Sequence, residues 1–464
     1  MLWSHYRSAC LVVCLILVLA GRDGWAEQPA AKTYDLAARQ VPGRTWQVDA
    51  QLRVGGQVLL SKDNRSIKLP ISVVGQFRYQ ELPLAGANHL RSVRHYEEAT
   101  AVIKVDRDGS KPILRSDRRL FVADWDGTGP VTLFSPNGPI TREELDLVDI
   151  LGNSLVLGTL LPDRPLAVGG KWSNSDESLV ALLGLSAVSQ CDVESVLVQV
   201  KGQSARIAVG GTVLGSAAGV GTELRLKGRY DFDLTLGQIT QMELVVDEDR
   251  ALGHVGPGLD VTARLTLKRH PVGSSQRLAR AAATLASAAV DRADLELDLQ
   301  SAQAGFQLTH DRDWYVTEAR RDLIILRRVD RGELLAQANI SPLTAKSSDR
   351  QTNLAQFQKD IRFALNDRFG AFVNASQWLN RAGHQVYRVV ARGAIEKLPI
   401  EWRYYLVSAA GGHRVALAFT VEVPLADRLG DEDRRLVESA ELFAPQRQDQ
   451  AAATARANRS GQAK

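Results

Sequence analysis

The 464-residue sequence predicts an α+β protein in two parts. The first part is an N-terminal domain built on a large curved antiparallel β-sheet with a few covering helices, and the second is a smaller α+β domain. Long segments of the first half alternate apolar and polar residues, a period of two that places every apolar side chain on one face of a sheet. In the second half, strand-like segments flank an amphipathic helix, which is typical of helices packed on an antiparallel sheet. The expected ranges are 33–272 for the β-rich domain, 273–293 for an alanine-rich helical linker and 294–445 for the second domain.

The first 26 residues have the pattern of a secretory signal peptide. Arg7 gives a basic start, and the run from Ala9 to Ala20 is almost wholly apolar. Small residues at Gly24 and Ala26 suit signal peptidase, so we expect cleavage between Ala26 and Glu27. The apolar run is shorter than the roughly 20 residues that a membrane span needs. The sequence therefore predicts a protein exported to the periplasm or the extracellular space, with no membrane span after cleavage.

Charge and cysteine content narrow the class of protein further. A net charge of +4 is small for a chain of this length, so we expect no nucleic-acid partner. Two of the three cysteines, Cys10 and Cys14, lie in the signal peptide, which leaves Cys191 alone and the mature chain without an internal disulfide. Acidic neighbours raise the pKa of a thiol, so Cys191, with Asp192 and Glu194 beside it, is interpreted as a packing residue and not a nucleophile.

Three segments of the first half show the strand pattern most clearly: Trp46 to Val54, Leu224 to Leu236 and Leu259 to Leu267. They are longer than the usual five or six residues, which favours a large twisted sheet with one wet face. The glycines near the middle of this half are interpreted as hairpin turns and bulges and not as a phosphate-binding loop; they are Gly210, Gly211, Gly215, Gly219 and Gly221.

Helices are expected at three places in the first 293 residues. Thr141 and Glu144 form a capping box at the start of one helix, and Ser175 can cap a second. We expect both helices to cover the apolar face of the sheet. The segment from Gln276 to Ala289 is alanine-rich, and its low content of bulky residues predicts few contacts with either domain.

The second domain is expected to contain seven strands, a central helix and a closing helix. The predicted segments, in chain order, are Leu295 to Leu299, Phe306 to His310, Leu323 to Val329, Leu334 to Ile340, a helix from Leu354 to Phe369, Val386 to Arg392, Glu401 to Val407, Val415 to Val423 and a helix from Asp431 to Ser439. In the strand around Arg403, Trp402 and Tyr404 share one face and Tyr405 takes the other, so core packing is expected for all three. Residues 446–464 have almost no large apolar side chain and are expected to be disordered.

Several of these segments carry a resemblance to a known family. The string Gly305–Leu308, the tryptophan at Trp314, the helix around Phe357, the run Pro399–Tyr405 and the end from Val437 to Phe443 are similar to the PsbP-like α/β/α sandwich. His310 stands where that family usually has proline. The two-part layout of the whole chain also resembles uncharacterised exported bacterial proteins. The resemblance implies a role in binding or assembly and no shared catalytic group.

One motif suggests an enzyme. The strand Leu120 to Ala123 is followed by Asp124 and Asp126, which resembles the first motif of haloacid-dehalogenase-type phosphatases. In that reading Asp247, Asp249 and Lys171 would complete the site. The motif requires a parallel sheet with alternating helices, however, and residues 185–270 are predicted to be consecutive strands. A β-turn is the simpler interpretation.

The remaining polar clusters indicate no cofactor or metal site. His310 to Asp313 contains a single histidine and is interpreted as a solvated loop. The favoured function is a non-catalytic binding or assembly protein of the cell envelope, whose partner is an envelope protein or an apolar ligand. The alternatives are a carrier of an apolar or acyl ligand on the concave face of the N-terminal sheet, and the phosphatase using Asp124 and Asp126.

Overall fold

The computed structural model describes residues 32–39, 43–62, 65–84, 89–286, 288–344 and 353–445. The described chain is mostly β, with a large antiparallel sheet of 13 strands and smaller sheets of seven, four and two strands. The predicted signal peptide, its cleavage site at Ala26 and Glu27, and the predicted tail at 446–464 lie outside the described residues. None of the helices in the described ranges is both long and apolar enough to cross a membrane.

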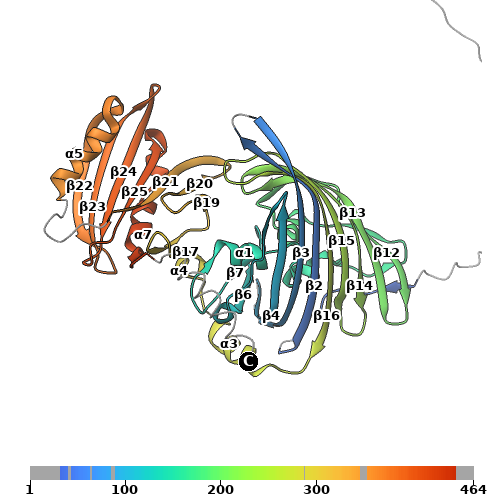
Figure 1. Cartoon of the computed structure of the whole chain (residues 1–464). Helices are drawn as coiled ribbons and strands as arrows, with labels where there is room; N and C mark the ends of the chain where they lie inside the picture. The colour runs from blue at the N-terminus through green and yellow to red at the C-terminus, as the bar shows by residue number, and fades with distance from the viewer. Residues whose placement is uncertain are drawn as a thin grey trace, which may run out of the picture.

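The large sheet takes up most of the first half of the chain and is strongly curved (Figure 1). Its main path runs β10 (Lys171–Ser173), β12 (Glu194–Lys201), β13 (Ser204–Ala217), β14 (Val220–Asp233), β15 (Gln238–Arg250), β16 (Gly258–Val272), β2 (Thr45–Lys62), β3 (Arg65–Leu84), β4 (Leu90–Val105), β6 (Leu120–Trp125) and β7 (Thr132–Phe134). Two further strands join it at the side: β5 (Asp108–Ser110) on β4 and β11 (Ala187–Cys191) on β13. Outside this sheet, β1 (Thr33–Tyr34) pairs with β9 (Leu166–Ala167).

The predicted long strands are confirmed, except that the segment Leu224 to Leu236 ends as a strand at Asp233 and continues as a turn. β2 has 18 residues and β3 has 20, and both follow the period of two. The turn interpretation holds for Gly219: Ala218 and Gly219 form the tight turn between β13 and β14 with positive φ. The other four glycines lie within β13 or β14, which pair without a register shift. At Gly211 strand β13 passes so close to Asp192 that a Cβ atom would lie 2.7 Å from its carbonyl oxygen.

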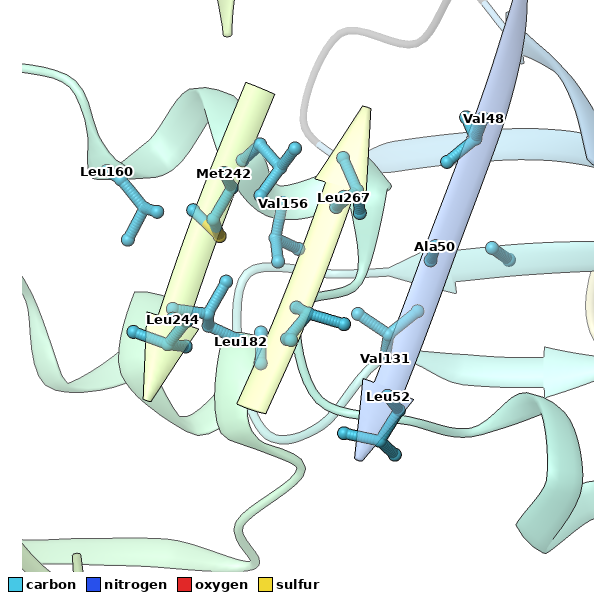
Figure 2. Packing of buried hydrophobic residues seen from close by; sticks show 14 of the residues in the cluster. Val48, Ala50, Leu52, Val131, Val156, Leu160, Leu182, Met242, Leu244 and Leu267 are labelled. Atoms are coloured by element: carbon cyan, nitrogen blue, oxygen red, sulfur yellow. The ribbon is translucent and has the colours of Figure 1, made fainter. Parts of the chain in front are cut away.

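Three short helices cover one face of the sheet, which we call the covered face. They are α1 (Arg142–Val148), the 3-10 helix η2 (Ser154–Leu160) and α2 (Asp176–Leu183). The capping box predicted at Thr141 and Glu144 is present, and the Ser175 hydroxyl accepts from the backbone N–H of Ser178. Figure 2 shows the resulting core, in which side chains of β2, β15 and β16 face side chains of the covering segment: Val48, Ala50, Leu52, Met242, Leu244 and Leu267 against Val156, Leu160 and Leu182.

The alanine-rich segment is tied to the N-terminal sheet, contrary to the sequence-based expectation of few contacts. Helix α3 (Gln276–Leu285) buries Leu278 completely against Leu82, Leu84 and Val93 of β3 and β4. Ala281, Ala282 and Leu285 of the same helix pack against this cluster. The segment is therefore an additional covering element of the first half.

The second half is built on a seven-stranded antiparallel sheet with helices on both faces. Its spatial order is β19 (Trp314–Ala319), β20 (Ile324–Asp330), β21 (Glu333–Leu343), β25 (Arg414–Glu422), β24 (Leu398–Ser408), β23 (Gln385–Ile395) and β22 (Phe369–Leu379). Helix α5 (Leu354–Leu365) packs on one face, and the 3-10 helix η5 (Val423–Leu425), α6 (Ala426–Leu429) and α7 (Glu432–Glu438) pack on the other. Trp402 and Tyr404 lie in the core under α5 and Tyr405 in the opposite core, as their alternation predicts.

Three details of this half differ from the prediction. Strand β19, at the edge of the seven-stranded sheet, was not among the predicted strands. The helix ends at Leu365 and not at Phe369, and is followed by η4 (Asn366–Arg368) and by β22, which was not predicted. His310 does not lie in a solvated loop: it ends β18 (Phe306–His310), is 2% exposed and has its pKa lowered to about 4 by burial.

The two halves are joined by a shared four-stranded sheet of order β26 (Glu441–Leu442), β18, β17 (Leu297–Ser301) and β8 (Ile140–Thr141). β8 belongs to the first half and pairs in parallel with β17 of the second. Leu297 at the start of β17 is buried in the core of the first half. The short helix α4 (Arg292–Leu295) leads into this junction.

Candidate functional site

An apolar cavity lies between the covered face and α1. It has a volume of about 360 Å³. The sheet wall consists of side chains from the middle of β2, β3 and β4, and the opposite wall comes from α1 and the segments beside it; the lining residues are Leu52, Val73, Gly75, Phe77, Ala101 and Ile103 on the sheet and Pro112, Arg142, Glu143, Asp146, Leu147 and Ile150 opposite.

The pairing of small residues across three strands explains why space remains here. Gly75 pairs with Leu52 on one side and with Ala101 on the other, so two of three neighbouring positions carry almost no side chain. A Cβ atom at Gly75 would lie 2.8 Å from the ring of Phe77, which folds back along the strand beneath it. Phe77 therefore forms a floor of the cavity, and any larger residue at position 75 would collide with it.

Charged side chains of α1 form the rim. Arg142, Glu143 and Asp146 come from the first turns of this helix, whose start is fixed by the capping box. Arg142 also contacts the second half of the chain: its guanidinium lies 4.6 Å from the ring centroid of Tyr315 and donates to the backbone carbonyl of Arg312. The rim of the apolar cavity is thus in direct contact with the second half.

A buried network of charged and polar side chains lies farther along β3 on the same face. The Glu81 carboxylate is 1% exposed and accepts hydrogen bonds from Ser92 Oγ at 2.9 Å, Arg94 Nε at 2.9 Å and Ser154 Oγ at 2.8 Å. Arg94 is 2% exposed and also donates to Asn153 Oδ1 at 2.5 Å. Burial raises the pKa of Glu81, but the charges of Arg94 and Arg269 together with the hydrogen bonds of Ser154 and Ser92 hold that pKa below its usual value. The network fixes the start of η2 to the sheet.

A second, smaller cavity of about 240 Å³ adjoins this network at the ends of β2, β3 and β16. It is lined by the charged and polar side chains of Glu81, Ser154, Thr159, Gln238 and Arg269 and by the less polar residues Ala38, Trp46, Pro83, Leu90, Leu155 and Gly158. The Arg269 guanidinium is 4.6 Å from the ring centroid of Trp46. This cavity therefore combines an apolar wall with a buried cation.

The residues of the predicted phosphatase motif do not gather into one site. Asp124 lies in β6, which pairs antiparallel with β4 and β7, so the parallel neighbours that the motif requires are not there. Asp124 accepts from Arg91 Nε at 2.5 Å, and Asp126 accepts from the backbone N–H and hydroxyl of Thr128, both at 2.9 Å, in the predicted turn.

The residues expected to complete that site are dispersed. Asp247 and Asp249 lie on β15, which four strands separate from β6 in the sheet order, and Lys171 lies on the edge strand β10 beside Glu194. Cys191 is a half-buried free thiol packed against the main core, and burial raises its pKa. Within the described ranges, no group of three or more histidine, cysteine, aspartate or glutamate residues is placed to hold a metal ion.

The sequence analysis did not identify Glu81 and Arg269 as candidate site residues, although the strand pattern contains a signal for a buried charge. Val261, Ala263, Leu265 and Leu267 alternate on the covered face of β16, and Arg269 is the next residue of that series. A charged side chain that continues the apolar series of a strand is expected to be buried. Because burying an unpaired charge is costly, such a residue is expected to belong to a buried network of partners.

Comparisons with known proteins give distant structural matches, two of which cover about a third of the chain. No protein-family model matches the chain, and no curated protein sequence matches it. The cyanobacterial PsbP protein (CyanoP) of Synechocystis matches 34% of this chain and 99% of its own at 13% identity, with a TM-score of 0.26. Protein PA94 of Pseudomonas aeruginosa matches 33% of this chain and 98% of its own at 12% identity, with a TM-score of 0.22. Lipovitellin matches 55% of this chain and 27% of its own at 8% identity, with a TM-score of 0.27.

Proposed function

We propose that this chain is an exported, non-catalytic binding protein that holds an apolar ligand, such as an acyl chain, in the cavity between the covered face and α1. The observation that carries the proposal is the cavity of about 360 Å³ walled by Leu52, Phe77 and Ile103. Its volume lies within the range of about 300–1,000 Å³ that is usual for small-molecule sites. Export is supported by the signal-peptide pattern of the first 26 residues.

The chemistry of the cavity favours an apolar ligand over a polar one. Gly75 and Ala101 leave open space instead of a packed core, and the charged groups stand at the rim on α1. A ligand there would exchange water contacts for contacts with aliphatic and aromatic side chains, a gain of about 25 cal/mol for each Å² of apolar surface buried.

In this proposal the second half is a PsbP-like sandwich, and its role is assembly and not catalysis. Its support is the layer order, with α5 on one face of the seven-stranded sheet and α6 and α7 on the other. Arg142, at the cavity rim, contacts this half at Tyr315, so the proposed ligand site and the proposed assembly domain are neighbours.

The proposal is tested with N-phenyl-1-naphthylamine, a neutral apolar probe whose fluorescence rises in apolar surroundings. Two adjacent valines of β3 provide a matched pair: Val73 lines the cavity, whereas Val74 points to the opposite face and is 43% exposed. Val73→Trp should weaken probe binding at least tenfold because the indole fills the cavity. Val74→Trp should leave the affinity unchanged.

Two results would contradict the proposal. One is the absence of saturable probe binding to the unsubstituted protein. The other is equal affinity in Val73→Trp and Val74→Trp, which would place the probe elsewhere. Circular dichroism of both variants checks that the sheet is intact.

A further inference from the structure

The smaller cavity is lined by a buried cation, Arg269, that has few hydrogen bonds and, among the described residues, no carboxylate within hydrogen-bond distance. Arg269 is 6% exposed. Its Nη1 donates to Gln238 Oε1 at 3.4 Å, while Nη2 stays 3.9 Å from Glu81 Oε2, beyond hydrogen-bond distance. Its Nε is buried without a hydrogen-bond partner in the described part of the chain. A guanidinium carries five N–H donors, so most of the hydrogen-bonding capacity of Arg269 is unused.

Charge balance in the network leads to the same conclusion. Glu81 is the carboxylate that acts on Arg269, but it already accepts hydrogen bonds from Arg94, Ser92 and Ser154. With both arginines and the glutamate ionised, Arg94, Arg269 and Glu81 carry a net charge of +1. A buried charge without a full set of partners is costly, and an anion brought into the cavity would offset that cost.

The surroundings of the cation restrict what that anion can be. The central carbon of the Arg269 guanidinium lies over the Trp46 ring, a contact that restricts the position of the cation. The rest of the lining is largely apolar, with Pro83, Leu90 and Leu155 among it. A planar fork of donors matches a carboxylate, which can accept two parallel hydrogen bonds.

We propose that the smaller cavity is a second binding site, for a small organic carboxylate whose apolar body packs against Trp46 and Leu155 and whose carboxylate pairs with Arg269. This site differs from the proposed apolar site in both chemistry and place. Trp46 and Glu81 pair across β2 and β3, six residues along each strand from the Leu52–Gly75 pair. At about 3.3 Å for each residue, the two sites lie roughly 20 Å apart.

The two cavities are also separated by packed side chains. Between them, Phe77, Tyr79 and Ile150 enclose a space of about 10 Å³, which is no larger than one water molecule needs. The Tyr79 hydroxyl is 2.9 Å from Ser154 Oγ and so joins the Glu81 network to this barrier. A ligand in one cavity therefore leaves the other one free.

Calorimetric titration of the full chain with benzoate and benzamide tests the proposal. The two probes have nearly the same shape, but only benzoate carries a charge. We expect saturable binding of benzoate with one equivalent per chain, and binding of benzamide at least tenfold weaker. Equal affinities, or no saturable heat from benzoate, would overturn the proposal, and this comparison needs no substituted protein.

A pair of substitutions on β16 locates the site. Arg269 is buried on the covered face, and Arg264 is exposed on the opposite face of the same strand. Arg269→Gln should reduce benzoate affinity at least tenfold, whereas Arg264→Gln should not change it. Equal loss in both variants would overturn the proposal. Binding of N-phenyl-1-naphthylamine should be normal in Arg269→Gln, which shows that the variant is folded and separates failure of this site from failure of the apolar site.

Discussion

Replacing Glu81 with glutamine should strongly destabilise the centre of the large sheet, although the two side chains have nearly the same shape. The carboxylate accepts three hydrogen bonds and is the counter-charge between Arg94 and Arg269, all in a region less than one-tenth exposed. Breaking a buried ion pair by removing the charge of one partner costs about 3–5 kcal/mol, because the remaining charge stays buried. We therefore expect Glu81→Gln to lower the free energy of unfolding of β2, β3 and β4 by about that amount.

Hydrogen exchange of the backbone amides of β2 and β3 is the suitable assay, because it measures the opening of these strands separately from the second half of the chain. Asp49→Asn is the matched control: Asp49 pairs with Arg78 at 2.8 Å across the same two strands, but both side chains are exposed. An exposed pair contributes little, so this variant should exchange like the unsubstituted protein. If Glu81→Gln loses no more protection than Asp49→Asn, the reasoning about the buried network is wrong.

The same network predicts a pH dependence with a definite sign. The pKa of Glu81 is below its ordinary value of about 4.5 in the folded protein. Burial raises it, but the charges of Arg94 and Arg269 and the hydrogen bonds of Ser154 and Ser92 together lower it by more. The ionised carboxylate therefore stabilises the fold above pH 4.5, and this contribution is lost as the pH falls through the folded pKa. Protection of β2 and β3 should decline below pH 4.5 in the unsubstituted protein, and that part of the decline should be missing in Glu81→Gln.

Three further predictions concern other parts of the chain. Leu278→Ala should destabilise the docking of α3 by about 2–5 kcal/mol, because it leaves a cavity against β3 and β4, and thermal melting with proteolysis of α3 would detect it. Asp433→Asn should cost about 3–5 kcal/mol, because Asp433 is fully buried and accepts from Arg403 Nη1 at 2.9 Å; hydrogen exchange of β24 measures the loss. The exported protein should begin at Glu27, as N-terminal sequencing would show, and a start at Met1 would contradict the signal-peptide interpretation.

Strand positions and the faces of their side chains could be predicted from the sequence because alternation is a local property. The series Val261 to Leu267 faces the core as its period requires, and Thr141 with Glu144 begins α1 because a capping box involves four adjacent residues. The apolar cavity was beyond this reasoning. It depends on the register that sets Gly75 beside Ala101, two residues that are far apart in sequence.

Strand β22 was missed for an identifiable physical reason. Its register shifts between Phe369 and Ala371 and again between Phe372 and Asn374, so each bulge inserts a residue and breaks the period of two. The residues that pack toward α5 are Phe369, Phe372 and Ala375, at a spacing of three that imitates a helix. The prediction therefore extended the preceding helix to Phe369 and left the strand unassigned.

Strand β17 and the residues around it tie the two halves of the chain together. Leu297 and Leu299 belong to the same strand, but Leu297 packs in the core of the first half and Leu299 against the core of the second. Arg312 of the second half donates to the backbone carbonyl of Leu133 in the first at 2.6 Å. A sequence pattern shows that β17 has an apolar face, but not that two cores divide it. The pairing of β8 with β17 consequently connects the half that contains the apolar cavity to the half that contains the seven-stranded sheet. Arg142, at the rim of that cavity, makes a second connection through Tyr315.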